Sequence, residues 1–136
     1  MRHEQVHTDP DPYAPYLLSQ AIRAGGFLFV SGQAAVGDDG GIVGRGDFDA
    51  QAQQAFSNLE RALQAGGSSL GRVVKVTVFL TSMAYVDKMV ELRRKWFSAP
   101  YPAETMVEVS ALYSPDAMIE IEAIALADDA ASLRYA

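Results

Sequence analysis

The chain has 136 residues, the size of one domain, and its 49% hydrophobic and 21% charged residues are ordinary for a globular protein. Its formal net charge of -6, with eleven Lys and Arg residues spread along the chain, argues against a nucleic-acid partner. The lack of cysteine excludes disulfides, thiolate nucleophiles and Cys-ligated metals. Because no apolar run reaches membrane-spanning length and no signal core follows Met1, we expect a cytoplasmic protein without a membrane partner.

The N-terminal part of the sequence is rich in turn-forming residues. Residues 1–18, where Asp and Pro crowd together, predict an irregular lead-in to a domain over residues 19–126. The run Phe27–Val30 is aromatic and β-branched, which indicates a buried strand ended by Ser31-Gly32. The small and polar residues 127–136 predict a C-terminal tail.

Two segments show the spacing of amphipathic helices. Apolar residues recur three and four apart from Phe48 to Ala65, and Asp47 or Asp49 could cap the start of this helix. Gly66 and Gly67 are expected to end it. A second helix is predicted over residues 86–97, before Pro100 and Pro102, with one mostly apolar face formed by Val86, Met89, Val90, Arg93, Trp96 and Phe97.

Three further strands are predicted, over residues 73–80, 105–112 and 118–126. The first of these is expected to be an interior strand. One of its faces carries Val74, Val76, Val78 and Leu80, and the other carries Val73, Lys75, Thr77 and Phe79. Together with the helices they give the order β, α, β, α, β, β of an α+β domain. Polar residues in these strands need hydrogen-bonding partners or ordered water; these residues are Lys75, Thr77, Glu108, Glu120 and Glu122. Lys75 could pair with a glutamate of a neighbouring subunit.

No chemistry follows from these elements alone. The sequence has no phosphate-binding loop, no nucleophile with an evident base and no cluster at metal-ligand spacing. His3 and His7 are four residues apart, but their Pro-rich surroundings favour a mobile tail over a metal pair. We therefore expect no cofactor and no metal.

A series of short motifs, taken in their order and spacing, resembles the RidA/YjgF family of reactive intermediate deaminases, formerly called L-PSP endoribonucleases. The resemblance spans roughly residues 19–126. It implies a chorismate-mutase-like fold, in which a mixed sheet is backed by two helices, and a barrel-like homotrimer that binds ligands in the clefts between subunits. The motifs are Ser31-Gly32-Gln33, Gln51 through Asn58-Leu59 to Ala65-Gly66-Gly67, Val73–Leu80, Pro102-Ala103, Val107-Glu108-Val109 and Ile119–Ala125.

The resemblance also shows where this chain departs from the family. Members that hydrolyse imines typically carry an arginine directly after the Pro-Ala pair, where it grips the substrate carboxylate, and this chain has Glu104 there. Two unit charges 4 Å apart interact by about 4 kcal/mol at an effective dielectric near 20, so Glu104 should repel a substrate carboxylate. Activity on 2-imino acids should therefore be weak or absent. Met106, Val90 and Leu18 stand where the family often has cysteine, asparagine and tyrosine, whereas Ser31, Gly32 and Glu120 match it.

Two hypotheses of function follow, both with a small-molecule ligand. In the first, the protein hydrolyses C–N bonds of a neutral or cationic imine, enamine or related amine, with Glu104 and Glu120 sharing acid and base roles. Against that pairing, Glu104 could instead meet Arg93, Arg94 or Arg23, or face solvent. In the second, the trimer binds an apolar metabolite without chemistry or is an interaction scaffold, and the contacts come from Met106, Val90, Leu18 and Tyr101. The acidic charge disfavours a nuclease.

Overall fold

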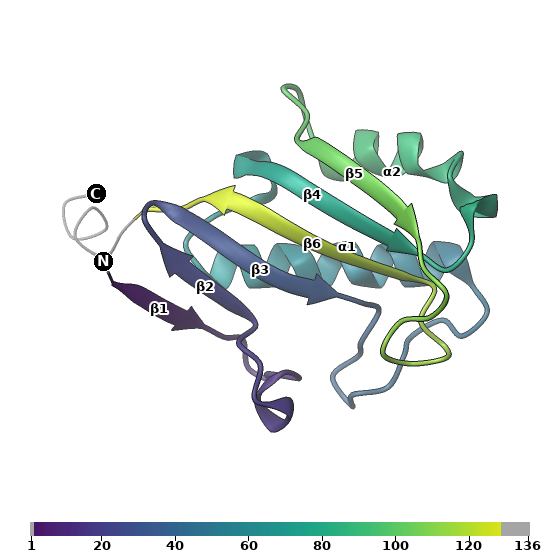
Figure 1. Cartoon of the computed structure of the whole chain (residues 1–136), viewed down its shortest axis with the longest axis horizontal. Helices are drawn as coiled ribbons and strands as arrows, with labels where there is room; N and C mark the ends of the chain where they lie inside the picture. The colour runs from purple at the N-terminus through teal and green to yellow at the C-terminus, as the bar shows by residue number, and fades with distance from the viewer. Residues whose placement is uncertain (1, 129–136) are drawn as a thin grey trace.

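The computed structural model describes residues 2–128, which form a six-stranded mixed sheet covered on one face by two helices (Figure 1). The strand order is β1-β2-β3-β6-β4-β5, in which β4 and β5 are parallel and all other neighbours antiparallel. The predicted α+β class is confirmed. The elements are β1 (His3–Val6), β2 (Ala21–Ala24), β3 (Phe27–Gln33), α1 (Phe48–Ala65), β4 (Val73–Leu80), α2 (Lys88–Trp96), β5 (Ala103–Glu108) and β6 (Ile119–Leu126).

Helix α1 has the bounds that the apolar spacing predicts. Of the two candidate caps, Asp47 is the one used, since its side chain accepts a hydrogen bond from the Ala50 N–H at 3.1 Å. After the helix, Gly67 has a φ of 78°, which favours glycine, and the Ser68 N–H returns to the Leu63 carbonyl at 2.9 Å. Its apolar face is buried against β3 and β6 and includes Ala52, Ala55, Phe56, Leu59, Ala62 and Leu63.

Helix α2 is shorter than the predicted span 86–97, because it begins at Lys88 and its C-cap is Phe97; a 3-10 turn over residues 83–85 precedes it. Met89 is fully buried, and the Trp96 ring stacks on Phe56 of α1 with centroids 5.4 Å apart. Phe97, just past the helix, packs edge-on against the Phe56 ring, with ring centroids 5.9 Å apart. These aromatic contacts attach α2 to α1.

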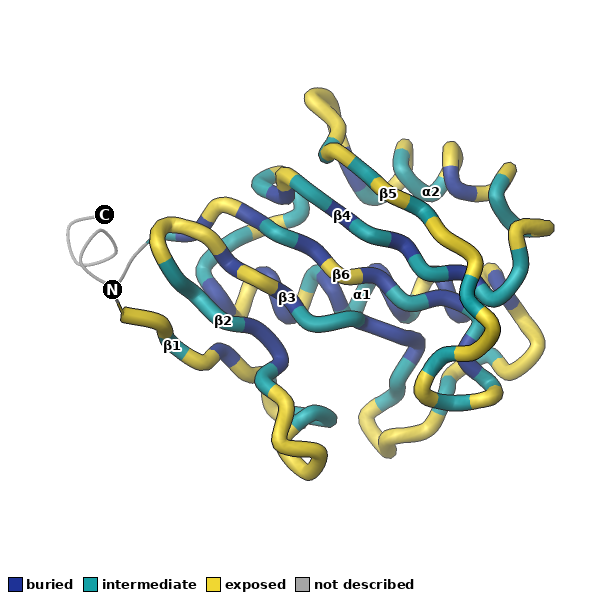
Figure 2. Tube along the Cα trace, viewed as in Figure 1, coloured by how far each residue is buried: buried dark blue, intermediate teal, exposed yellow. Residues whose placement is uncertain are grey.

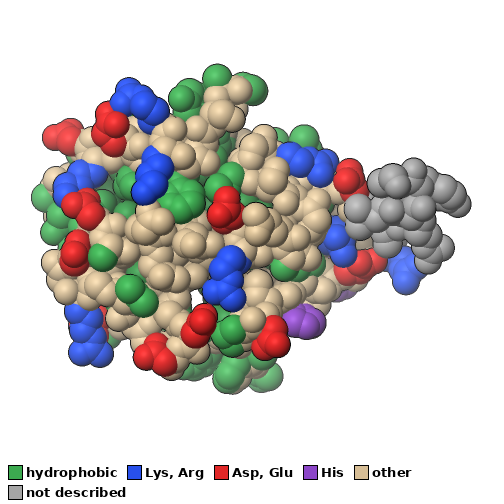
Figure 3. Space-filling view, turned by 180° about the vertical axis from the view of Figure 1, so that it is seen from behind, with side chains coloured by type: hydrophobic (Ala, Val, Ile, Leu, Met, Phe, Trp, Pro, Cys, Tyr) green, Lys and Arg blue, Asp and Glu red, His purple; other side chains and the backbone are tan. Residues whose placement is uncertain are grey.

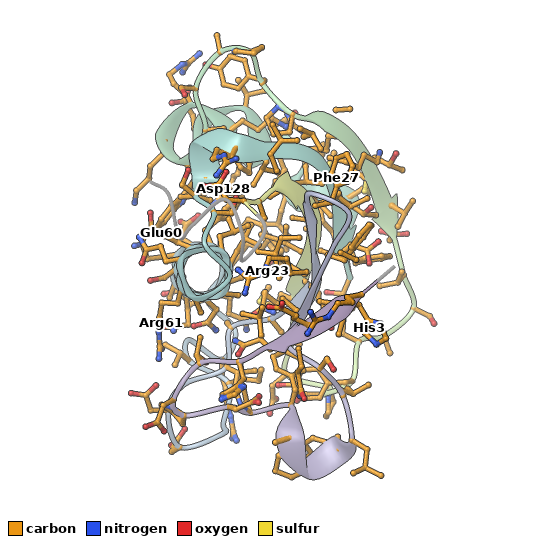
Figure 4. All side chains as sticks on the ribbon, turned by 90° about the vertical axis from the view of Figure 1, so that its left-hand side faces the viewer. His3, Arg23, Phe27, Glu60, Arg61 and Asp128 are labelled. Atoms are coloured by element: carbon orange, nitrogen blue, oxygen red, sulfur yellow. The ribbon has the colours of Figure 1, made fainter. Side chains whose placement is uncertain are left out.

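The sheet has two strands that the sequence analysis missed. β1 lies in the lead-in expected to be irregular, and β2 follows it, so His3 belongs to a strand and not to a mobile tail. Arg23 on β2 holds this edge together, because its guanidinium donates to Glu4 at 3.1 Å and to the Gly66 carbonyl at 2.8 Å. Figure 4 shows Arg23 between the sheet and the end of α1.

Two of the predicted strands differ in detail from the structure. A bulge between Val73 and Lys75 turns Val74 outward, so Val73 takes the buried position beside Val76. β5 ends at Glu108 and not at residue 112, because its partner β4 ends at Leu80, the residue in register with Glu108. Residues 127–128 of the predicted tail follow β6, and residues 129–136 lie outside the described residues.

The two faces of the sheet differ in burial, as Figure 2 shows along the strands. Residues such as Leu28, Val76 and Ile121 point toward the helices and are fully buried. The opposite, open face carries Lys75, whose ammonium donates to the Thr105 hydroxyl at 2.7 Å within the chain. Neither helix in the described residues has the length and apolarity needed to cross a membrane.

Candidate functional site

A cavity of about 690 Å³ lies where the loop of residues 8–20 passes the ends of β3 and β6. The turn around residues 36–40 and one side of α1 complete its wall. Three of the residues proposed from the resemblance line it, namely Leu18, Gly32 and Glu120. Ser31 supports it from behind, since its hydroxyl donates to the Ser19 carbonyl at 2.6 Å and its N–H to the Gln20 carbonyl at 2.9 Å.

Glu120 is the chemically notable residue of this cavity. It points to the open side of β6, and its carboxylate lies directly over Gly32, where a Cβ would come within 1.8 Å of Oε1. Glycine is therefore needed at position 32 for space. Burial, and to a lesser degree the neighbouring Glu122, raise the pKa of Glu120. No described residue donates a hydrogen bond to this carboxylate, which remains available to a ligand or water.

Tyr13 is a site residue that the sequence analysis missed. Its hydroxyl donates to the Gly32 carbonyl at 2.5 Å, which places the ring in the cavity wall beside Glu120. Burial first, and then the negative charge of Glu120, raise the pKa of Tyr13 well above its ordinary value, so the phenol stays protonated. The resemblance pointed to Leu18 as the position of the family's tyrosine. Leu18 also lines the cavity, and Tyr13, from the Pro-rich lead-in, contacts Gly32.

Glu104 lies elsewhere, on the helix-facing side of β5. Its carboxylate pairs with Arg93 of α2, with Arg93 Nε 2.9 Å from Oε1 and a second hydrogen bond from Nη2 to Oε2. Of the three arginines considered as partners, Arg94 pairs with Glu91 and Arg23 with Glu4. In this structure, Glu104 thus forms a bidentate ion pair with Arg93.

The remaining predicted site residues do not line this cavity. Val90 and Tyr101 are each 53% exposed, and Met106 packs partly against the core. Glu104 is in register with the core-facing Val76, whereas Glu120 is in register with Phe79, which faces the open side. The two glutamates of one chain therefore point to opposite faces of the sheet. They could share a site only if two copies of the chain contributed one each.

The six-stranded mixed sheet and the two helices that cover it define a RidA-like fold. Residues 6–127 match the family model described as Endoribonuclease L-PSP, and the chain belongs to this family, also called RidA/YjgF.

Three relatives illustrate the match. The RutC family protein PH0854 of Pyrococcus horikoshii is 45% identical over 116 residues, which cover 85% of this chain and 90% of that protein. The 2-iminobutanoate/2-iminopropanoate deaminase of Dermatophagoides farinae is 32% identical over 85% of this chain and 88% of its own. The crystal structure of RidA from the Antarctic bacterium Psychrobacter sp. PAMC 21119 superposes with a TM-score of 0.82 at 35% identity, covering 90% of this chain and 98% of that one.

Proposed function

We propose that this protein hydrolyses the C–N bond of a small imine or enamine in the cavity beside Glu120, at a cleft that a second copy of the chain completes. The observation that carries the proposal is the Glu120 carboxylate, which lies in the cavity wall without a hydrogen bond from the described residues. A relative named as an imine deaminase supports the reaction class. The net charge of -6 supports a small ligand over nucleic acid, and on the face shown in Figure 3 acidic and basic side chains are interspersed.

In the proposed reaction, Glu120 accepts a proton from water as the water oxygen bonds to the imine carbon. The π electrons of the C=N bond move to nitrogen, which takes up a proton and gives a carbinolamine. Glu120 then transfers the hydroxyl proton of the carbinolamine to its nitrogen, the C–N bond breaks, its electron pair leaves on nitrogen as ammonia or an amine, and the carbon keeps the oxygen as a carbonyl. A carboxyl group whose pKa is raised toward the working pH is suited to carry a proton in both directions.

The test begins with a thermal-shift screen of small imines, enamines and amines, followed by ammonia-release assays on the compounds that bind. We expect Glu120→Gln to lower kcat by about 10²–10⁴-fold, because the amide keeps the size but loses the basicity of the carboxylate. Glu60→Gln, on the side of α1 away from the sheet (Figure 4), is the matched control. Ligands that bind without release of ammonia would favour the alternative of a non-catalytic metabolite-binding trimer.

Activity on 2-imino acids should be low for two reasons. Glu104 stands where the resemblance places an arginine, and the Glu104 carboxylate accepts a hydrogen bond from the guanidinium of Arg93, which is then not free to bind a substrate carboxylate. Glu104→Ala frees Arg93 and should raise turnover of freshly generated 2-iminopropionate at least about tenfold, equivalent to about 1.4 kcal/mol. The double variant Arg93→Ala, Glu104→Ala should lose that gain. A wild-type rate equal to that of an arginine-bearing relative would contradict this prediction.

We also propose that the protein is a homotrimer joined through the open face of the sheet. This face leaves large apolar side chains partly exposed, with Phe29 at 45%, and a neighbouring subunit could cover them. Phe29→Glu should therefore dissociate the trimer into folded monomers at micromolar concentration, as measured by light scattering with circular dichroism as the folding control. A monomeric wild-type protein would contradict the trimer and the shared cleft together.

A further inference from the structure

The cavity beside Glu120 is lined by aromatic and acidic side chains. Three tyrosines, Tyr13, Tyr16 and Tyr113, line it together with four carboxylates, and Arg61 is the cation among the lining residues described. Arg61 is itself engaged, with Nη1 3.4 Å from Oδ1 of Asp38. The wall thus offers aromatic surface and negative charge, and little that would stabilise an anion.

The four carboxylates are not equivalent. Asp11 accepts a hydrogen bond from the Tyr13 N–H at 2.9 Å, and Asp39 accepts one from the Gly41 N–H at the same distance. Asp38 is paired with Arg61. Glu120 is left as the lining carboxylate without such a partner among the described residues, and its carboxylate lies against Gly32 of β3. A ligand's positive charge would therefore be placed at Glu120.

The tyrosines add to this preference. The Tyr13 hydroxyl uses its proton on the Gly32 carbonyl, so it offers its ring and its oxygen lone pairs to a ligand and not a hydrogen-bond donor. Burial first, and then the negative charge of Glu120, raise the pKa of Tyr113. An aromatic face beside a carboxylate is the arrangement that attracts organic cations, since the ring quadrupole adds to the attraction of the charge.

We propose that the cavity selects an organic cation, such as a protonated amine or an iminium ion on a compact apolar skeleton, with its N–H groups on Glu120 and its carbon atoms against Tyr13 and Tyr113. This inference rests on the proposed function and narrows its substrate class, because the carbon of an iminium ion is already activated toward attack by water, whereas a protonated amine shares only its charge and N–H groups. A substrate carboxylate, in contrast, would meet acidic groups and no free cation of the described lining.

The experiment uses three probes of equal size and different charge: benzylamine, benzyl alcohol and benzoate. Calorimetry on the full chain at neutral pH should show benzylamine, which is protonated there, binding at least about tenfold more tightly than the alcohol, and benzoate not binding. Glu120→Gln should abolish the advantage of benzylamine and leave the alcohol unchanged, whereas Glu60→Gln should alter neither. Tyr113→Leu should weaken benzylamine several-fold while Glu120 remains in place.

Equal binding of the amine and the alcohol, tighter binding of benzoate, or an advantage of benzylamine that survives Glu120→Gln would each overturn the inference. The folding of every variant is checked by circular dichroism, and Tyr113→Leu serves as the second variant if Glu120→Gln does not fold. Failure of the proposed function is distinguishable. If cations bind as expected but no imine or enamine releases ammonia, the cation site stands without the hydrolase. If a neutral or anionic imine is hydrolysed without preference for cations, the hydrolase stands without the cation site.

Discussion

Replacing Phe56 with alanine should lower the free energy of unfolding by about 3–5 kcal/mol, the largest stability effect that we expect from a single substitution in this chain. Phe56 lies on the buried face of α1 and is 1% exposed. Its ring stacks on Trp96 at the end of α2 and meets the edge of Phe97. Alanine would remove both aromatic contacts and leave a cavity that the rigid α1 backbone cannot fill.

The measurement is urea denaturation of wild type and variant, compared at constant protein concentration because the proposed trimer makes stability concentration-dependent. Tyr101→Ala is the control, since it also removes an aromatic ring but from a side chain that is 53% exposed, and it should cost well under 1 kcal/mol. A loss below about 1 kcal/mol for Phe56→Ala would mean that α2 is not held to α1 through this ring. The position of Arg93 on α2 would then need another explanation.

The elements predicted with correct bounds are those whose pattern is long and complete. α1 repeats its apolar spacing over 18 residues between the Asp47 cap and Gly66-Gly67, and β4 spans eight residues that alternate from Lys75 onward, so local signals suffice to place both elements. β1 and β2 have four residues each, too few for a period to emerge, and they exist because Arg23 and the partner strands support them. The end of β5 is likewise a tertiary effect, since residues 109–112 contain no glycine or proline that would end a strand, but β4 does not continue beside them.

The candidate site divides in the same way. Glu120 and Gly32 were recognised through short motifs, and the structure brings them into direct contact. Tyr13 was missed because nothing local distinguishes a tyrosine in a Pro-rich loop, and its role depends on a hydrogen bond to a residue 19 positions away. Glu104 could have met any of three arginines, and only the packing of α2 against the sheet selects Arg93.

Gly32→Ala should lower C–N hydrolysis or cation affinity by about 10²-fold while leaving the fold nearly as stable as before. The added Cβ would come within 1.8 Å of Glu120 Oε1, so the carboxylate must move aside by more than an ångström. Displacements of this size at a reacting group commonly cost about 10²-fold in rate. Stability should change little, because the clash is with the end of a flexible side chain that is not hydrogen-bonded to the described residues.

The control is Gly71→Ala in the 3-10 turn Leu70–Arg72, where the nearest atom to the new Cβ would be the Ser69 hydroxyl at 4.0 Å. This variant should match wild type in activity, affinity and melting temperature. The double variant Gly32→Ala, Glu120→Gln should be scarcely worse than Glu120→Gln alone, because both changes remove the same carboxylate from the same place. If the two losses multiply instead, Gly32 contributes to the site through its own backbone groups, and the space it leaves for Glu120 is not the reason for glycine at this position.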